Sequence, residues 1–388
     1  MEAEEAIALA RSLAPVKTAE VVPVAETVGR TLAEDVRALR DLPAAESSAM
    51  DGWAVRSADT PGTLAAAGES SAGHPSERRL EPGQAMAIST GASLPEGADA
   101  VARREIVEQA GAEVRVTAAV ADGRDVRRRG ETIRAGDTLL RAGHRVAPHE
   151  VGALGAMGHG TVLCAPRPRV AVLATGAELV PLGAAARPSQ VHDSSRHGIA
   201  AQAVAAGSEV VASASVGDEI EATVAALAGM LDATGDRRPD VVVTNGGISV
   251  GVHDVVRPAL ARLGVEELIR GVRIAPVWPT YLGRRGDQIV LGLPGNPAAA
   301  AIAFHLLGRP LLGADDEWWR SGPLAVAIAS RPGRAELVRC VEGPDGLTPL
   351  AAQGSHAVTS LAGATALAWL REDDDGAAGS RVAFSRLS

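Results

Sequence analysis

A turn rich in glycine and proline, set between two apolar runs, is the segment of this 388-residue chain that most suggests chemistry. Residues 291–297 read Leu-Gly-Leu-Pro-Gly-Asn-Pro, follow the apolar run 289–291 and precede the alanine-rich stretch 298–307. Pro297 falls where a helix tolerates proline, at its first position. A helix that begins there presents unpaired N–H groups and the positive end of its dipole, which suits a phosphate or another oxyanion. The motif predicts a strand, a turn and a helix around an anion site; a turn that only packs is the alternative.

Two further loops of similar chemistry also follow apolar runs. The run 170–174 is followed by Thr-Gly-Ala-Glu (175–178), and the run 241–243 by Thr-Asn-Gly-Gly-Ile-Ser-Val-Gly (244–251). Glycines let the backbone approach a ligand, and Thr and Ser hydroxyls can bond phosphate oxygens. None of the three loops matches the P-loop pattern, which disfavours an ATPase of that class. The residues expected to contact an anionic ligand are Thr175, Gly246, Gly247, Ser249, Gly292, Pro294, Gly295, Asn296 and Pro297.

Four acidic residues lie in or near these loops: Glu178, Asp193, Asp218 and Asp254. Beside phosphates, isolated carboxylates commonly hold Mg²⁺, which keeps several waters and takes only one or two protein oxygens. A helix cap or a solvated turn is the alternative for each of them, and above all for Asp218. Glu178 and Asp254 each lie in a loop that begins at a strand end, and we expect both to bind the ligand or its metal.

The loops lie in a part of the chain where short apolar runs alternate with helical stretches. This alternation predicts a doubly wound parallel α/β sheet, with the ligand at the carboxyl ends of its strands. The expected strands are 170–174, 209–214, 241–243 and 289–291, and the expected helices are 198–206, 219–233 and 255–263. Outside this region, a short helix is expected over 2–13, and β-rich segments over 39–137 and 324–388.

Composition excludes several classes of function. The formal net charge is −9, whereas nucleic acids and anionic membranes attract an excess of Lys and Arg, so neither is expected as a partner. Cys164 and Cys340 lie far apart, which argues against a disulfide framework or a zinc site. The N-terminus resembles no signal peptide, and no apolar run approaches the length of about 18 residues that spans a membrane. A cytoplasmic protein is therefore expected.

Motifs along nearly the whole chain resemble one known family in order and spacing. Ser-Ala-Met-Asp-Gly-Trp-Ala (48–54) resembles the Ser-Ala-Met-Asp-Gly-Tyr-Ala signature of the MoeA and gephyrin E-domain family, the molybdopterin molybdenumtransferases. The other segments that carry the resemblance are 89–101, 126–140, 167–179, 246–251, 292–297 and 353–355.

The resemblance implies an elongated homodimer of four-domain chains that act in molybdenum cofactor biosynthesis. The family takes adenylylated molybdopterin and molybdate as substrates, places the molybdenum on the dithiolene sulfurs and releases AMP, with Mg²⁺ on the phosphates. The implied domains are a molybdopterin-binding α/β domain (1–15 and 168–315), a linking and dimerisation domain (16–38 and 138–167), a β-rich insert (39–137) and a small β-barrel domain (316–388).

Residue roles follow from the same resemblance. Asp51 and Thr90 would reach the cleft from the partner's insert, while Glu178, Asp218 and Asp254 would serve Mg²⁺ and phosphate positioning. The catalytic set is therefore Asp51, Thr90, Asp218 and Asp254, and the metal set is Glu178 and Asp254. Arg339 and Ser355 occupy positions that the resemblance associates with molybdate.

The sequence departs from the family pattern at four positions: Ala275 and Trp278 replace two lysines, Ala299 a serine, and Thr132 an aspartate. Charge-assisted bonds contribute roughly 1.5–3 kcal/mol each, so losing two cations beside an oxyanion is a large change. Arg273 and Arg284 are the candidate substitutes. Three functions stay open: a working molybdenumtransferase, a paralogue that binds the pterin nucleotide without inserting metal, and a nucleotide or pyrophosphate hydrolase on the same fold.

Overall fold

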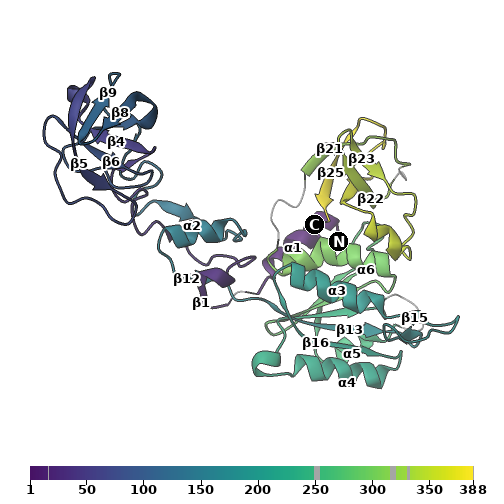
Figure 1. Ribbon diagram of the computed structural model, residues 1–388. Coiled ribbons are helices and arrows are strands. Elements are labelled where there is room, and N and C mark those ends of the chain that lie inside the picture. The colour runs from purple at the N-terminus through teal and green to yellow at the C-terminus, as the bar shows by residue number, and fades with distance from the viewer. Residues whose placement is uncertain (16, 249–253, 315–319, 330–332, 388) are drawn as a thin grey trace. The chain divides into compact units, whose positions relative to one another are not determined.

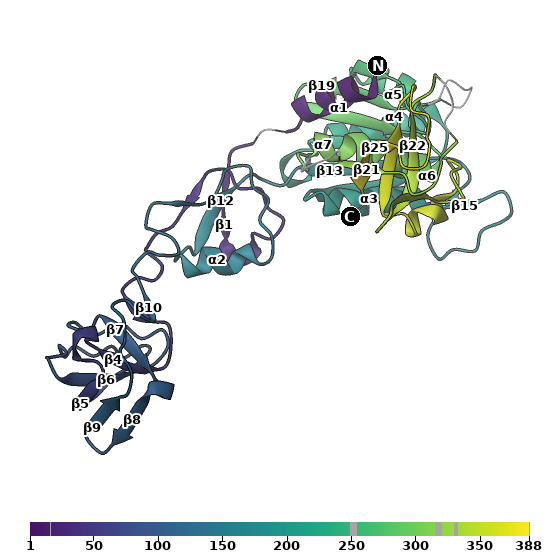
Figure 2. The same ribbon diagram turned by 90° about the horizontal axis from the view of Figure 1, so that it is seen from above.

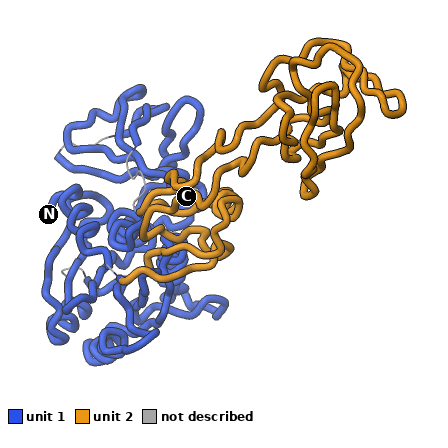
Figure 3. Tube along the Cα trace, turned by 90° about the vertical axis from the view of Figure 1, so that its left-hand side faces the viewer, with its two compact units in different colours: residues 1–17, 166–388 blue, residues 18–165 orange. Residues whose placement is uncertain are grey.

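The computed structural model describes residues 1–15, 17–248, 254–314, 320–329 and 333–387. The chain forms two compact units, one of residues 1–17 and 166–388 and the other of residues 18–165 (Figure 3). Each unit has its own hydrophobic clusters, and we describe each by itself.

The first unit contains a mixed sheet whose six described strands run in the order β16-β13-β17-β20-β19-β18. Four of them are parallel neighbours, as predicted from the alternation of strands and helices. Two further strands that were not predicted complete one edge of the sheet, where β19 runs antiparallel to β20 and β18 runs antiparallel to β19. The strands are β13 (Arg169–Thr175), β16 (Glu209–Val216), β17 (Val241–Asn245), β18 (Glu266–Arg270), β19 (Tyr281–Arg285) and β20 (Gln288–Leu293).

Helices cover both faces of this sheet, so the doubly wound architecture is confirmed (Figure 1). Along β13, Val170 and Val172 pack on the face covered by α3, whereas Ala171 and Leu173 pack on the face covered by α4 and α5. Successive strand residues point to opposite faces and both faces are covered, which is why β13 is apolar from Val170 to Ala174. The helices are α1 (Ala3–Ser12), α3 (Ser194–Ala205), α4 (Ile220–Leu231), α5 (Val256–Arg262), α6 (Pro297–Ala303) and α7 (Arg309–Leu311).

The helix predicted over 298–307 is not a regular α-helix along its whole length. After α6, residues Phe304–Gly308 form a π-helical turn that leads into α7. Pro310 has no N–H to donate back along the helix, and its ring would crowd the carbonyl four residues earlier, so a wider turn is favoured. Gly308 fits this turn because a Cβ there would lie 2.6 Å from the ring of Phe304.

The C-terminal part of the first unit is, as far as the structure describes it, a five-stranded antiparallel sheet in the order β21-β25-β24-β22-β23. It lies beside α6 in both views (Figures 1 and 2). His305, which is 3% exposed, joins the two parts through Nε2, which lies 2.9 Å from the Ser385 hydroxyl of β25. The strands are β21 (Arg320–Pro323), β22 (Glu336–Gly343), β23 (Gly346–Pro349), β24 (Ala366–Leu370) and β25 (Arg381–Arg386).

We expect His305 to make the first unit sensitive to acid. Burial, with a smaller contribution from Arg309, lowers the pKa of His305 to about 3. The unfolded chain binds a proton at this side chain below about pH 6.5 and the folded chain does not, so stability is lost as pH falls from 6.5 toward 3. Urea unfolding of the wild type and of His305→Asn at pH 7 and pH 4 measures this contribution, which is on the order of 3 kcal/mol. If both proteins lose the same stability between pH 7 and pH 4, His305 is not the source of the acid sensitivity.

The second unit contains a six-stranded sheet among its described residues, in the order β7-β4-β6-β5-β9-β8, and three two-stranded pairs. Helix α2 (Glu150–Ala156) packs with β1 and β12 around Leu154, which is fully buried. The sheet strands are β4 (Gly52–Val55), β5 (Gly62–Ser70), β6 (Gln84–Ile88), β7 (Ala100–Arg103), β8 (Val107–Ala110) and β9 (Glu113–Val116). The pairs are β1 (Glu20–Pro23) with β12 (Thr161–Cys164), β2 (Val36–Arg37) with β11 (Thr138–Leu140), and β3 (Ser47–Ser48) with β10 (Val126–Arg127).

Among the described helices of both units, none is both long and apolar enough to cross a lipid bilayer.

Candidate functional site

A cavity of about 650 Å³ lies at the carboxyl ends of β13, β17 and β20, where the sequence predicts the ligand. The turns that follow these three strands form much of its wall, and one residue of the C-terminal part, His356, also lines it. The predicted residues that line it are Thr175, Glu178, Asp218, Gly246, Gly247, Pro294, Gly295, Asn296 and Pro297.

The floor of the cavity requires glycine at two successive positions. Gly246 and Gly247 have φ of +88° and +63°, which side chains rarely adopt. A Cβ on Gly246 would lie 2.7 Å from the Thr175 carbonyl oxygen, and one on Gly247 would lie 2.8 Å from Val256. Asn245 fixes the neighbouring turn by donating its side-chain N–H to the Pro294 carbonyl (2.6 Å). The backbone of two loops is thus held close together, with room for a ligand above it.

The helix after the Gly-Pro turn differs from the prediction. Asn296 precedes α6 and Pro297 is its first residue, as expected. The backbone N–H groups of Ala298 and Ala299 donate to the Ser355 carbonyl at 3.1 and 3.3 Å, so the prediction that these groups are unpaired is wrong. Asn296 also donates its side-chain N–H to the Ser355 hydroxyl (2.9 Å). Ser355 therefore caps α6, so the turn and Pro297 line the cavity while the N–H groups of Ala298 and Ala299 are used within the protein.

Two of the predicted acidic residues face the cavity together. Both carboxylate oxygens of Glu178 lie 2.8 Å from the position that a Cβ on Gly176 would occupy, so the carboxylate folds back over this glycine. Ala177 donates its backbone N–H to Oδ2 of Asp218 (3.1 Å), which places this second carboxylate beside the same loop. Asp193 also lines the cavity, and Arg196 binds it at 2.5 Å.

Asp254, predicted as a metal ligand, lies in a half-buried position beside Arg257. It is absent from the described lining of the cavity. Burial raises the pKa of its carboxyl group, and Arg257, whose Nη1 lies 3.8 Å away, partly opposes the shift. Its Oδ1 is buried and has no hydrogen-bond partner among the described residues. Its predicted roles in catalysis and metal binding stay predictions.

Three other predicted ligand-binding residues also lie outside the lining that the structure describes. Gly292 is buried inside β20, and Ser355 contacts the turn only as described above. Arg339, on β22, is 1% exposed and donates from Nη2 to the carbonyls of Ala352 and Gly354 at 3.0 and 3.1 Å. Its Nε and Nη1 have no partner among the described residues, and burial lowers its pKa. Ser249 falls outside the described residues.

In the second unit, the structure brings Asp51 and Thr90 together. Asp51 Oδ1 accepts hydrogen bonds from the backbone N–H of Thr90 (2.7 Å) and from its hydroxyl (2.9 Å). These two bonds, the backbone one first, hold the pKa of Asp51 below its usual value. The carboxylate is exposed and charged at neutral pH, so it is available to a ligand or a metal.

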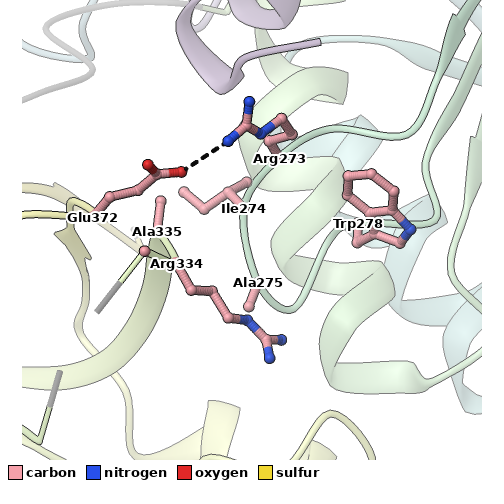
Figure 4. Close-up of a pocket in the computed structure, with 8 residues that line it drawn as sticks. Arg273, Ile274, Ala275, Trp278, Arg334, Ala335 and Glu372 are labelled. Atoms are coloured by element: carbon pink, nitrogen blue, oxygen red, sulfur yellow. Dashed lines mark hydrogen bonds and ion pairs between the residues drawn. The ribbon is translucent and has the colours of Figure 1, made fainter. Parts of the chain in front are cut away.

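Arg273 and Arg284, the candidate substitutes for the two missing lysines, both form ion pairs with acidic residues outside the large cavity. Ala275 and Trp278 line a separate cavity of about 220 Å³ with Arg273 (Figure 4). Arg273 forms ion pairs with Glu2 (2.9 Å) and Glu372 (3.2 Å). Arg284, on β19, pairs with Glu266 at 2.9 Å. Neither arginine belongs to the described lining of the large cavity.

Sequence reasoning missed several residues of the cavity wall. Ser194 and Ser195 begin α3 directly after Asp193, the acidic residue that the sequence did single out, and a polar start to a helix near a strand end is a signal that could have been used for them. His356 gave no such signal, because it reaches the cavity from a part of the chain about 60 residues beyond the Gly-Pro turn. The further lining residues that were not named as ligand contacts are Gly176, Leu179, Val191, His192, Asn245 and Pro279.

Three family models match the chain in succession. Residues 1–158 match the MoeA N-terminal region (domain I and II), residues 171–314 a probable molybdopterin binding domain, and residues 321–387 the MoeA C-terminal region (domain IV). The cavity described above lies largely in the second of these segments. The matches define a multidomain protein built around a probable molybdopterin binding domain.

Whole-length comparisons agree with these matches. Molybdopterin molybdenumtransferase 2 of Mycobacterium tuberculosis is 33% identical, over 91% of both chains. The molybdopterin molybdenumtransferase of Bacillus subtilis is 30% identical, over 89% of this chain and 84% of the relative. The crystal structure of a molybdopterin biosynthesis MoeA protein from Pyrococcus horikoshii matches with a TM-score of 0.82 and 29% identity, over 100% of this chain and 99% of that one. The chain belongs to the MoeA family of molybdopterin molybdenumtransferases.

Proposed function

We propose that this protein inserts molybdate into adenylylated molybdopterin and releases AMP, as a step of molybdenum cofactor biosynthesis. The names of its relatives support the reaction class, since several are called molybdopterin molybdenumtransferase at 30–34% identity over most of this chain. The large cavity supports the substrate class, because backbone, hydroxyl and amide groups converge there as they do in sites for phosphorylated ligands.

The charge of the cavity is the observation that carries this proposal furthest. Its described lining includes the carboxylates of Glu178, Asp193 and Asp218 and no arginine or lysine. Arg196 pairs with Asp193 at 2.5 Å, so the negative charge that a phosphate would meet comes mainly from Glu178 and Asp218. A pyrophosphate is itself an anion, and like charges at close range repel strongly when partly removed from water. A phosphorylated substrate therefore needs a divalent cation in this cavity to offset the repulsion.

Mg²⁺ fits the residues that are present. No three described His, Cys, Asp or Glu side chains come close enough together to hold a metal ion by themselves. Mg²⁺ needs no such cage, because one or two carboxylates together with substrate phosphates and waters satisfy it. Glu178 and Asp218 would hold it, and when bound it would neutralise charge on the phosphates. The chain's own part is to fix the Glu178 carboxylate over Gly176 and the Asp218 carboxylate on the Ala177 N–H.

Molybdate is the second substrate, and Arg339 and Ser355 are its proposed contacts. The unpartnered Nε and Nη1 of Arg339 are the kind of donors that a tetraoxoanion binds well. Both atoms are buried, while Nη2 holds the segment 352–354 through two carbonyls. We therefore propose that an oxyanion reaches Arg339 only after this segment has shifted.

The assembly and location of the protein also belong to the proposal. We propose a cytoplasmic homodimer in which Asp51 and Thr90 of one chain serve the cleft of the other. The match of residues 1–158 to the MoeA N-terminal region supports a family role for this part, and the exposed Asp51 carboxylate supports a ligand contact. The division into four domains, at the boundaries expected from the sequence, is retained as part of this proposal.

Reconstitution with purified components tests the function. The full-length protein is incubated with adenylylated molybdopterin, Mg²⁺ and molybdate at micromolar concentration, and molybdenum bound to the pterin is measured. We expect multiple turnovers per protein chain. Molybdenum incorporation no higher than that of a protein-free mixture would overturn the proposal.

A further inference from the structure

Trp278 is an exposed indole in a chain with few aromatic residues. Aromatic residues make up 2% of the sequence. The ring-bearing side chains of Tyr281, Phe304, Trp369 and Phe384 are buried, whereas Trp278 is 57% exposed and is the one aromatic among the described large apolar residues on the surface. Leaving an indole in water forgoes the stabilisation that burial would give, which suggests that a ligand covers it.

The exposed indole lies against one backbone segment on its edge. Its Cε2 and Cζ2 atoms lie 3.6 and 3.7 Å from the position that a Cβ on Gly271 would take, so the ring rests against the backbone there. Gly271 has a φ of +84°, which favours glycine. The carbonyl of Trp278 also accepts hydrogen bonds from the N–H groups of Val272 (3.1 Å) and Thr280 (2.9 Å). These contacts restrict the ring and its backbone before a ligand binds, which lowers the conformational entropy that binding costs.

A pocket of about 260 Å³ lies against Trp278 and carries two arginines at its wall. This volume is slightly below the range of about 300–1,000 Å³ that is typical of small-molecule sites, as suits a pocket for one ring of a larger ligand. Arg270 is largely exposed, with its Nε 3.0 Å from Glu267. Arg257 binds the same Glu267 through Nη2 at 3.1 Å, and its buried Nε has no partner among the described residues. An apolar wall with guanidinium groups beside it suits a flat aromatic ring that bears polar or anionic groups.

This pocket adjoins the large cavity at the strand ends. Pro279 lines both, and the consecutive residues Gly247 and Ile248 line one each. A single ligand can therefore place a phosphate in the cavity and a ring against Trp278. Trp278 also borders the cavity of Figure 4, where its ring is drawn apart from the Arg273–Glu372 ion pair.

We propose that Trp278 stacks on the planar heteroaromatic ring of the ligand whose phosphate lies in the large cavity. The identity of that ligand rests on the function proposed above, which offers two rings of the same chemistry, the adenine of AMP and the pterin. Trp278 is then a specificity-determining residue, and Arg270 borders the stacked ring.

Calorimetry with three probes tests this stacking in the full-length protein with Mg²⁺ present. The probes are AMP, pterin-6-carboxylate and ribose 5-phosphate, and the variants are Trp278→Ala and Trp278→Phe. Base stacking on an aromatic side chain is typically worth a factor of about 10 to 100 in affinity. We expect Trp278→Ala to lose this factor for a ring-bearing probe and Trp278→Phe to stay within about threefold. Val204→Ala, which trims a side chain of equal 57% exposure on α3, should change nothing.

The outcomes show whether adenine or pterin occupies the pocket, and they test the stacking role of Trp278 separately from the proposed molybdate insertion. Loss confined to AMP assigns the adenine to this pocket, and loss confined to pterin-6-carboxylate assigns the pterin. Ribose 5-phosphate, which lacks a ring, should bind all variants equally. If neither ring-bearing probe binds, or if Trp278→Ala binds both as the wild type does, the stacking role is overturned. Trp278-dependent binding in a protein that inserts no molybdenum would instead contradict only the proposed function.

Discussion

Exchanging Asp218 for Asn is expected to reduce molybdenum insertion about 100- to 1000-fold at fixed Mg²⁺, a factor typical of losing one preorganised electrostatic contact. The amide has nearly the same shape and can still accept the Ala177 N–H, so the exchange removes charge and leaves the loop in place. Glu178 would then be the only one of the two proposed Mg²⁺ ligands to keep its charge. Raising Mg²⁺ should recover part of the activity, and the Mg²⁺ concentration for half-maximal rate should increase.

The neighbouring residue provides the control for this variant. Glu219 is exposed and is absent from the described lining of the cavity, so Glu219→Gln should keep the activity and the Mg²⁺ dependence of the wild type. An Asp218→Asn enzyme that works within threefold of wild type with unchanged Mg²⁺ dependence would exclude Asp218 from metal and phosphate positioning.

The second large effect is expected at Gly246, where even a methyl group meets the backbone. Gly246→Ala places a Cβ 2.7 Å from the Thr175 carbonyl oxygen and 2.9 Å from its hydroxyl, at a φ of +88°. Relieving this contact must separate the turns that follow β13 and β17. We expect a loss of about 1–3 kcal/mol in the free energy of unfolding. Because a displacement of about 1 Å can cost a factor of about 100 in rate, activity should fall by at least that much.

Gly229→Ala is the matched control for this substitution. Gly229 lies in α4, and a Cβ there would meet no atom within 4 Å. Alanine favours helix by about 1 kcal/mol over glycine, so this variant should be as stable as the wild type or more so, with full activity. Urea unfolding and the insertion assay measure both variants. A Gly246→Ala protein with wild-type stability and rate would contradict the claim that the turns after β13 and β17 must stay this close together.

The sequence could predict the parts of the site that local patterns encode. Apolar runs such as 170–174 mark buried strands, and the glycines after them mark turns where the backbone bends sharply. Parallel strands bring such turns to one edge of a sheet, which is why Thr175, Gly246 and Gly295 meet in one cavity.

Other features of the fold and the site depend on contacts between residues far apart in the sequence, which local patterns do not encode. Ser355 caps α6 from about 60 residues away, so the sequence could not show that the N–H groups of Ala298 and Ala299 are paired. The strands β18 and β19 escaped prediction because Glu-Glu-Leu-Ile-Arg and Tyr-Leu-Gly-Arg-Arg are short and charged, as suits the antiparallel edge of a sheet. The π-helical turn at 304–308 did have a local signal, since Pro310 disfavours a regular helix before it.

The charge of the cavity also emerged only from the fold. Nearly every cation in the sequence is arginine, and Lys17 is the one lysine. A phosphate site would be expected to use some of these arginines, yet those near the strand ends pair with acids, as Arg196 does with Asp193 and Arg273 with Glu372. This pairing leaves carboxylates and neutral donors in the described lining and is the physical reason for expecting a metal-dependent reaction.

The molar ratio of AMP released to molybdenum incorporated, measured in one reconstitution with adenylylated molybdopterin, Mg²⁺ and micromolar molybdate, tests the central claim most directly. An enzyme that couples the two events gives a ratio close to one that persists over several turnovers. AMP release without molybdenum on the pterin would instead identify a hydrolase. Bound pterin nucleotide with neither product would identify a binding protein, and either result would contradict molybdate insertion by this chain.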